Sequence, residues 1–542
     1  MLKLGHALQG AIHATTQESL KRPDAHDVIV VGAGAAGGLA ALLLAEAGLR
    51  VLVLDAGWPH EGSPLINAIV RKLADPKNLR FVPPRFAILP KAAIRGVGLL
   101  RQPVQSRLPA WGREPEAFVD DRKCPYVTPP NRPFIWIRAR QIGGRMVVST
   151  HGGQYYRLSP SDLAPGDGSR PSWPLEPGEL DPWYSLVEHR LRLSGAREGI
   201  AWQPDSELGR VLTPNTNESS LMNSIRSSWP ASRPMLGRFA PPLDGLEGAA
   251  RTGRLRCRQG AIVKRIEVHP SGHVSGVSLF DLETRSEVRV SAPMVFLCAS
   301  ALESTRLLLL SETTNSPDGL GGGSGALGRH LMDHMIVAGW GSAPPLPASH
   351  HHEENRLIYL PRFDARADPK PGPGPGVGVQ LYQWPGTPTN SGFCAVTFGE
   401  MLPRSENRVM LHPKRRDAWG IPVLFIDCAY DDADLALARL QIETIRELAG
   451  ATGVTLTSIN TRPTMPGICA HECGTARMGR DPRDSVLDPH NQCWEAKGLY
   501  VTDGASFVTQ GSQNPTLTIL ALTARACHHA VGRTPEGSRL LT

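Results

Sequence analysis

The sequence predicts an α/β fold, α+β overall, in which a second domain built on an antiparallel sheet is inserted into a nucleotide-binding domain. Two observations predict it. Residues 27–57 read as a strand, a glycine loop, a helix and a second strand, which is the pattern of a βαβ unit. Residues 377–449 then carry short strand-like runs and a long helical run, and the sequence after them is again rich in glycine.

Composition limits the classes of protein to consider. At 542 residues, with 41% hydrophobic and 20% charged residues, the chain can form two joined domains with large cores. The Lys and Arg residues behind its net charge of +7 are scattered, so we expect no nucleic-acid partner. The nine cysteines have no repeating spacing, which favours reduced thiols. The N-terminal residues lack a long apolar stretch, so we expect a cytoplasmic protein without a membrane partner.

The first loop of the βαβ unit carries the motif GxGxxG, which predicts a Rossmann-like dinucleotide site. The first glycine makes the turn, the second lets the backbone approach a pyrophosphate, and the third lets the helix pack on the strand. An Asp at the end of the second strand can accept hydrogen bonds from ribose hydroxyls. The candidate cofactor contacts are Gly32, Gly34, Ala35, Ala36, Gly37, Asp55 and Ala56. This unit serves both NAD and FAD, so alone it leaves the cofactor open.

The next elements follow in chain order. Residues 65–133 are rich in Pro and Arg with little periodicity, which predicts an irregular excursion. A glycine pair, Gly143 and Gly144, comes next, and residues 180–195 read as a helix with an Asp-Pro start. Alternating runs in residues 254–290 predict a small antiparallel meander that leads into the buried strand MVFLCAS.

The second domain is predicted from the middle of the chain. Residues 343–376 carry Pro, Gly and the tract HHHEEN, which indicates a loop. The runs GVGVQLYQW, GFCAVTF and IPVLFIDCAY then read as short strands, and residues from about 431 to 449 read as a helix. We therefore expect a sheet-containing domain inserted into the first one.

The C-terminal sequence resembles that of a known family. HECGTARMGRDPRDSVLDPHNQCW, followed by LYVTDGASFVTQGSQNPTLTILALTARA, is similar to the end of the glucose-methanol-choline (GMC) flavoprotein oxidoreductases. RQIGGR, CASALESTRLLLLS and GRHLMDH match the same family in its order. The resemblance implies that the cofactor is FAD rather than NAD. Within the family, it is nearest to the branches that oxidise gluconate, fructose and pyranoses.

The resemblance also implies site residues. His471 would be the catalytic histidine over the flavin, and Asn514, in NPTLT, would be its partner. The further cofactor contacts that the resemblance implies are Gly143, Gly144, Val263, Ala299, Asp503, Gly504, Ala505, Pro515 and Thr516.

The chemistry of the two candidate catalytic residues agrees with these roles. Hydride removal from an alcohol needs a base for the hydroxyl proton, and histidine, with an ordinary pKa of about 6.5, suits that task at neutral pH. Asn514 can hold the substrate oxygen without competing for its proton. It also suits a helix N-cap with Pro515 in the first helical position, and that helix end would stabilise negative charge on a reduced flavin. From the residues alone, a structural histidine and a simple cap remain open.

Two features depart from the family pattern or compete with it. Where many relatives have serines after the glycine pair, this chain reads GGRMVVSTHGGQYYR. His151 in this string suggests a covalent link to the flavin as an alternative to noncovalent FAD. Metal binding is not expected, because residues 350–352 lie in a polar loop, and Cys469, His471 and Cys473 lack an evident fourth ligand.

We expect a discontinuous FAD-binding domain from residues 25–165, 250–335 and 466–535, and a substrate-binding domain from residues 166–249 and 336–465. The expected reaction is oxidation of a hydroxyl of a small polar sugar, aminosugar, glycoside or polyol, with oxygen or another electron acceptor. A non-redox lyase or isomerase, a catalytic subunit that passes electrons to a separate haem partner, and a non-enzymatic nucleotide sensor are the alternatives. The oligomeric state is left open.

Overall fold

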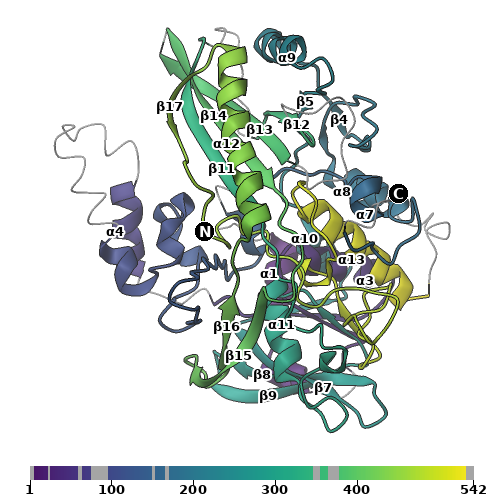
Figure 1. The fold of residues 1–542 in the computed structure, drawn as a ribbon. Helices are drawn as coiled ribbons and strands as arrows, with labels where there is room; N and C mark the ends of the chain where they lie inside the picture. Colours follow the sequence, from purple (N-terminus) through teal and green to yellow (C-terminus); the bar gives the residue numbers. More distant parts are fainter. Residues whose placement is uncertain are drawn as a thin grey trace.

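A computed structural model describes residues 5–21, 25–58, 64–74, 96–148, 153–164, 170–345, 355–363, 377–387 and 389–532 of the chain (Figure 1). A parallel five-stranded sheet has the order β18-β10-β1-β2-β6. Its strands are β1 (Val28–Val31), β2 (Val51–Asp55), β6 (Leu255–Gln259), β10 (Val295–Leu297) and β18 (Leu499–Val501). The three central strands are continuous apolar runs because both faces of the sheet are covered.

The order of the strands sets the place of a ligand site. From β1 the chain continues to β2 on one side, while β10 lies on the other side, so β1 and β10 flank a topological switch point. Helix α3 (Ala35–Glu46) follows β1 and packs against α10 (Gly245–Arg251) and α13 (Thr516–Ala530). A crevice is expected outside the carboxyl ends of these two strands.

A second, antiparallel sheet has the order β17-β11-β14-β13-β12-β5. Its strands are β5 (Met235–Leu236), β11 (Met335–Ala343), β12 (Ile358–Leu360), β13 (Val377–Thr387), β14 (Asn390–Gly399) and β17 (Thr455–Ile459). Helix α12 (Asp432–Thr452) runs along it (Figure 1), and its apolar residues share a core with Phe393 and Ala395 of β14. Since side chains alternate along a strand, Phe398 lies on the opposite face.

The remaining elements surround these two sheets. An antiparallel meander consists of β7 (Ala261–Val268), β8 (Val274–Asp281) and β9 (Ser286–Ser291). The other helices and short strands are α1 (His6–His13), α2 (Gln17–Lys21), α4 (Pro64–Ala74), α7 (Pro160–Leu163), α8 (Asp181–Leu191), α9 (Thr216–Ser228), α11 (Ala301–Leu310), β3 (Ser194–Gly195) and β4 (Arg210–Val211). Within the described ranges, no helix combines the length and the apolar character needed to cross a membrane.

The α/β fold class with two kinds of sheet is confirmed, but several local predictions were wrong. The antiparallel meander expected within residues 254–290 is confirmed as β7, β8 and β9, but the residues just before it form β6, which joins the parallel sheet beside β2. The strand expected at IPVLFIDCAY, β16 (Pro422–Asp427), pairs with β15 (Arg408–Arg416) in a separate hairpin that packs on α11. The region expected to be irregular contains α4. The differences at β6 and β16 concern which strand pairs with which, and pairing is not a local property of the sequence.

Candidate functional site

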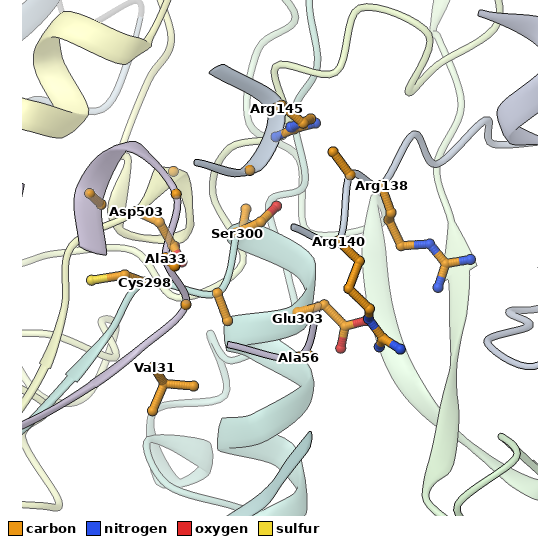
Figure 2. A pocket seen from close by; sticks show the side chains of 18 of the residues that line it. Val31, Ala33, Ala56, Arg138, Arg140, Arg145, Cys298, Ser300, Glu303 and Asp503 are labelled. Atoms are coloured by element: carbon orange, nitrogen blue, oxygen red, sulfur yellow. The ribbon is translucent and has the colours of Figure 1, made fainter. Parts of the chain in front are cut away.

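A cavity of about 290 Å³ lies at the carboxyl ends of β1 and β10 (Figure 2). Its wall is built by the glycine loop, the start of β7, the turn after β10, the loop around residue 471 and the start of α13. Most of the residues expected from the sequence line it: Gly32, Gly34, Ala35, Ala36, Asp55, Ala56, Gly144, Val263, Ala299, His471, Asp503, Gly504, Pro515 and Thr516. Residues from eight separate segments of the chain therefore meet in one place.

Other expected residues lie elsewhere. Among the described residues, Gly37, Gly143, Ala505 and Asn514 are not part of the cavity wall. A Cβ added to Gly37 would lie 1.9 Å from the carbonyl oxygen of the first glycine of the motif, so this glycine lets the helix approach the loop. The candidate flavin-linking His151 and the tract at 350–352 lie outside the described residues.

The glycine loop fits a dinucleotide pyrophosphate. Gly32 has φ of 99°, and an added Cβ would lie 2.4 Å from the carbonyl oxygen of Cys298. A Cβ added to Gly34 would meet no atom within 4 Å, which leaves room for a ligand. Gly34 is also the N-cap of α3 and makes no side-chain capping bond, so the first amides of this helix are available to phosphate oxygens.

Asp55 is held in place at the end of β2. Its Oδ2 accepts a hydrogen bond from the backbone N–H of Ala33 at 2.9 Å, and its Oδ1 accepts one from Gly57 at 2.8 Å. Burial raises the pKa of this carboxyl above its usual range. The side chain lines the cavity, where its remaining lone pairs can meet ribose hydroxyls.

The loop that carries His471 is fixed by a neighbouring carboxyl. Asp333 accepts hydrogen bonds from the backbone N–H of Gly467 at 2.7 Å and of His471 at 3.0 Å. The residue before the histidine, Ala470, has φ of 59°, a left-handed conformation that is unfavourable for a residue with a Cβ. Burial, and then the nearby Glu472, raise the pKa of Asp333 to about 7. Such local strain is common where a side chain is aimed at a site.

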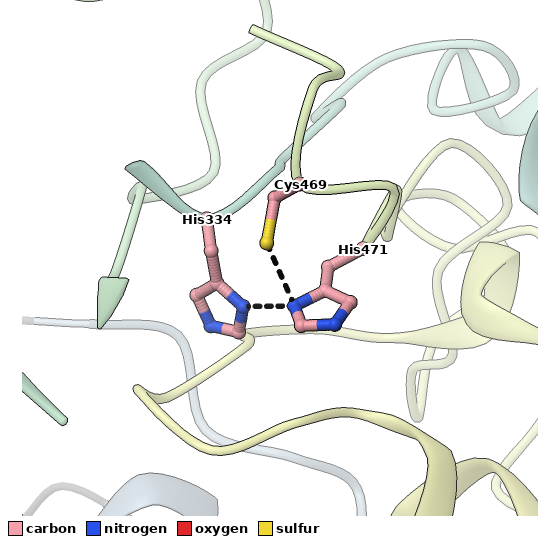
Figure 3. A group of neighbouring side chains, drawn as sticks. All are labelled: His334, Cys469 and His471. Carbon is pink, nitrogen blue, oxygen red and sulfur yellow. Dashed lines mark hydrogen bonds between the residues drawn. The ribbon is translucent and has the colours of Figure 1, made fainter. Parts of the chain in front are cut away.

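His471 contacts two other polar side chains (Figure 3). Its Nδ1 lies 2.8 Å from Nδ1 of His334 and 3.1 Å from Sγ of Cys469. Two Zn–N bonds of about 2.0–2.1 Å spanning 2.8 Å would enclose roughly 86°, far from the tetrahedral angle. The distance between the two Nδ1 atoms therefore suits a hydrogen bond better than a shared metal ion. His334, Cys469 and His471 are nevertheless all residue types that can bind a metal.

Asn514 is bound to the antiparallel sheet instead of capping a helix. Its Oδ1 accepts a hydrogen bond from Nε2 of Gln380 at 2.8 Å, and Oε1 of Gln380 accepts one from the Tyr382 hydroxyl at 2.7 Å. The N-cap prediction is thus wrong: α13 begins at Thr516, with Pro515 in the cap position and no side-chain cap. The amide nitrogen of Asn514 keeps two donors for a ligand oxygen.

Sequence reasoning missed two residues at this site. His334 ends the run GRHLMDH, which was used only as a family match, and Gln380 lies in a strand that was read only as a strand. A polar residue in an otherwise apolar strand, such as Gln380 in GVGVQLYQW, was the available signal. Nothing local indicates the partner of His334, which is 137 residues away.

Comparison with known proteins agrees with this geometry. A family model described as GMC oxidoreductase matches residues 403–523, and one described as FAD binding domain matches residues 27–66. The chain is 26% identical to 2-methyl-1,2-propanediol dehydrogenase of Mycolicibacterium austroafricanum, over 93% of this chain and 94% of the relative. It is 25% identical to the fructose dehydrogenase large subunit of Gluconobacter japonicus, over 94% and 98%.

A solved structure has the same fold. Pyridoxine 4-oxidase from Mesorbium loti aligns with a TM-score of 0.58 at 19% identity, over 93% of this chain and 99% of that chain. The overall arrangement of the chain therefore has a precedent among solved structures.

Proposed function

This chain belongs to the GMC oxidoreductase family and uses FAD, and we propose that it oxidises a hydroxyl of a sugar, aminosugar, glycoside or polyol to a carbonyl. One observation carries the proposal. The dinucleotide loop and His471 line the same cavity, so a bound dinucleotide and a base for an alcohol proton would share one enclosed space.

The reaction balances as a two-electron oxidation. When bound, FAD supplies the acceptor for a hydride. The alcohol gives its hydroxyl proton to the imidazole of His471, while the hydrogen on carbon leaves with its electron pair, and a carbonyl remains. Oxygen or another acceptor must then remove the two electrons for a new turnover.

Asn514 is proposed to hold the substrate oxygen from a position outside the described cavity wall, next in sequence to Pro515, which lines the cavity. Because Gln380 donates to its carbonyl oxygen, its amide N–H groups are directed to other acceptors. An N–H donor to the alcohol oxygen strengthens as negative charge develops on that oxygen, which favours loss of the proton.

The identity of the electron acceptor has one specific alternative. The likeness to a protein named as a large subunit supports electron transfer to a separate partner, which would replace oxygen as the acceptor. A non-redox reaction on the same fold is the second alternative, and the retained base in the cavity gives it less support.

An anaerobic reduction assay tests the proposal. Purified flavoprotein is mixed with a panel of sugars, aminosugars, glycosides and polyols while the flavin absorbance is followed. His471→Ala is measured alongside His412→Ala, which changes a partly exposed histidine outside the cavity wall. We expect one class of compound to bleach the flavin in the parent and in His412→Ala, and much more slowly in His471→Ala. Equal rates in all three proteins would contradict the role of His471, and a flavin that no alcohol bleaches would favour the non-redox reaction.

A further inference from the structure

We propose that His334 is a positioning residue that fixes the ring proton of His471 on Nδ1 and thereby makes Nε2 of His471 the catalytic base. The inference rests on the proposed function, because it assigns the atom that takes the alcohol proton. It follows from three contacts in the group shown in Figure 3.

The first contact fixes the proton of His334. Its Nε2 lies 2.9 Å from the carbonyl oxygen of Gly511, and a carbonyl oxygen can only accept, so Nε2 carries a proton. The side chain is fully buried, and burial lowers the pKa of His334 to about 4. At neutral pH the ring is therefore neutral, with one proton on Nε2 and a lone pair on Nδ1.

The second contact transfers this constraint to His471. The two Nδ1 atoms are 2.8 Å apart, a distance that requires one proton between them. Because Nδ1 of His334 has only a lone pair, Nδ1 of His471 must be the donor. Neutral His471 then has its own lone pair on Nε2. Because His471 lines the cavity, this lone pair is the one that takes the alcohol proton.

The third contact, with Cys469, is compatible with this assignment. Its Sγ lies 3.1 Å from Nδ1 of His471, and burial raises the pKa of the thiol well above its usual range, so the sulfur is neutral. If the thiol donated to Nδ1 of His471, the contact with His334 would have no proton and two facing lone pairs. The sulfur is therefore a weak second acceptor for the same N–H.

Other charged groups face the pair from the elements around it. Asp333 accepts from the backbone of His471, and Glu472 is paired with Arg145. Behind Gly511, Glu400 accepts from its backbone N–H and is paired with Arg170.

The buried phenol of Tyr430 lies near Asp333 and Cys469, and the ring of Phe398 stacks on His471 with centroids 5.9 Å apart. None of these groups is itself replaced when only residue 334 is changed. A difference in kcat or pH profile between variants at position 334 therefore measures the effect of the hydrogen-bond acceptor at that position.

The network also sets the direction of proton movement. When Nε2 takes the alcohol proton, His471 becomes a cation whose Nδ1–H donates to a neutral acceptor, a bond stronger than one between neutral groups. Nε2 of His334 already carries a proton and faces a carbonyl, so no proton can leave by that route. The accepted proton must return through the cavity.

Two variants of His334 separate the acceptor from its bulk. His334→Asn keeps an oxygen acceptor near the place of Nδ1, whereas His334→Leu has similar volume and no acceptor. Each is compared with the parent holoenzyme for flavin content, kcat, KM and the pH profile of kcat/KM, with the panel alcohol that reduces the parent fastest. A substrate-independent readout is the ¹⁵N spectrum of histidine-labelled holoprotein, assigned with His471→Ala, because protonated and bare ring nitrogens resonate separately.

We expect His334→Leu to keep the flavin content and KM of the parent. Its kcat should fall about 10- to 100-fold, the factor for one hydrogen bond to a charged group. The acidic limb of its pH profile of kcat/KM should shift to lower pH. His334→Asn should recover most of kcat and the position of that limb. In the parent spectrum the bare nitrogen of His471 should be Nε2. A bare Nδ1 in the parent, or the same kcat and limb in the parent and His334→Leu, would overturn the inference, whereas failure of the proposed function would appear as full activity of His471→Ala.

Discussion

Arg145 and Glu472 form an ion pair, with Nη1 and Oε2 2.7 Å apart, that joins the glycine-pair loop to the residue after the candidate base. The Glu472 side chain is fully buried, and the Arg145 side chain is 29% exposed and lines the cavity (Figure 2). Arg145 directly follows the glycine pair in the sequence. Its ion pair fixes the two loops relative to each other.

Replacing Arg145 should destabilise the protein strongly. Arg145→Met leaves the buried carboxylate of Glu472 without its cation, and breaking such a pair costs about 3–5 kcal/mol. Glu472→Gln in the same background should recover part of this loss, because the amide carries no charge. Chemical denaturation of the single and double variants measures the free energy of unfolding. The exposed pair of Arg480 and Glu176 is the control, since Arg480→Met should change stability by less than about 1 kcal/mol; similar losses in both single variants would contradict the argument.

Three glycines near the start of α3 should respond differently to alanine. In Gly37→Ala the new Cβ would lie 1.9 Å from a backbone oxygen, so we expect a loss of about 1–3 kcal/mol in stability. In Gly34→Ala the Cβ meets no protein atom but occupies the space for the pyrophosphate, so FAD should bind at least about tenfold more weakly at nearly unchanged stability of the flavin-free protein.

Gly38→Ala is the matched control for these two variants, because its nearest neighbour would be 4.0 Å away. It should keep FAD affinity and raise helix stability by about 0.5–1 kcal/mol. Thermal melting of the flavin-free proteins and fluorescence titration with FAD separate the two effects. A normal FAD affinity in Gly34→Ala would argue against the placement of the pyrophosphate.

Gln380 should matter for turnover although it is not a candidate catalytic residue. Gln380→Leu frees the Asn514 carbonyl oxygen, so the amide can turn its acceptor toward the substrate, and we expect kcat/KM to fall about three- to tenfold, as for one neutral hydrogen bond. Gln383→Leu is the control, because Gln383 is on the other face of the same strand and contacts Asn217 and Ser391. Equal effects of the two variants on steady-state kinetics would count against an orienting role.

The sequence predicted those parts of the fold that depend on residues close together in the chain. The βαβ unit is recognisable because its strand, glycine loop and helix follow one another within one short segment. By contrast, β6 was not predicted as a separate strand, because nothing local shows that it pairs with β2, about 200 residues before it in the chain. The start of α13 was misplaced because Asn514 bonds to Gln380, 134 residues away, and so does not act as a cap.

The candidate site shows the same limit. Motif and family resemblance indicated His471, but the residue that fixes its ring proton, His334, lies on another segment and its partner could not be read from spacing. The contacts of each residue therefore became known only from the fold, whereas the candidate dinucleotide site and the candidate base could be proposed from the sequence.

Asp333 should make stability depend on pH in a defined direction. Its pKa is raised to about 7, whereas an unfolded Asp has a pKa of about 3.9, so the folded protein binds the proton more tightly. This contribution to stability is fully present below about pH 4 and is lost as pH rises to about 7, by about 1.4 kcal/mol per pH unit. Asp333→Asn cannot ionise and lacks this dependence, although it is less stable overall because an amide oxygen replaces two acceptor oxygens.

The test therefore compares how the melting temperature changes with pH in the two proteins, not their absolute stabilities. Flavin-loaded parent and variant are melted between pH 4 and pH 8, and the parent melting temperature should fall relative to that of Asp333→Asn as the pH rises. Other carboxyls with raised pKa, such as Asp503 at about 6, contribute equally to both proteins and cancel in the difference. Parallel curves would mean that Asp333 is already ionised at pH 4 in the folded protein, and that its bonds to Gly467 and His471 are those of a carboxylate throughout.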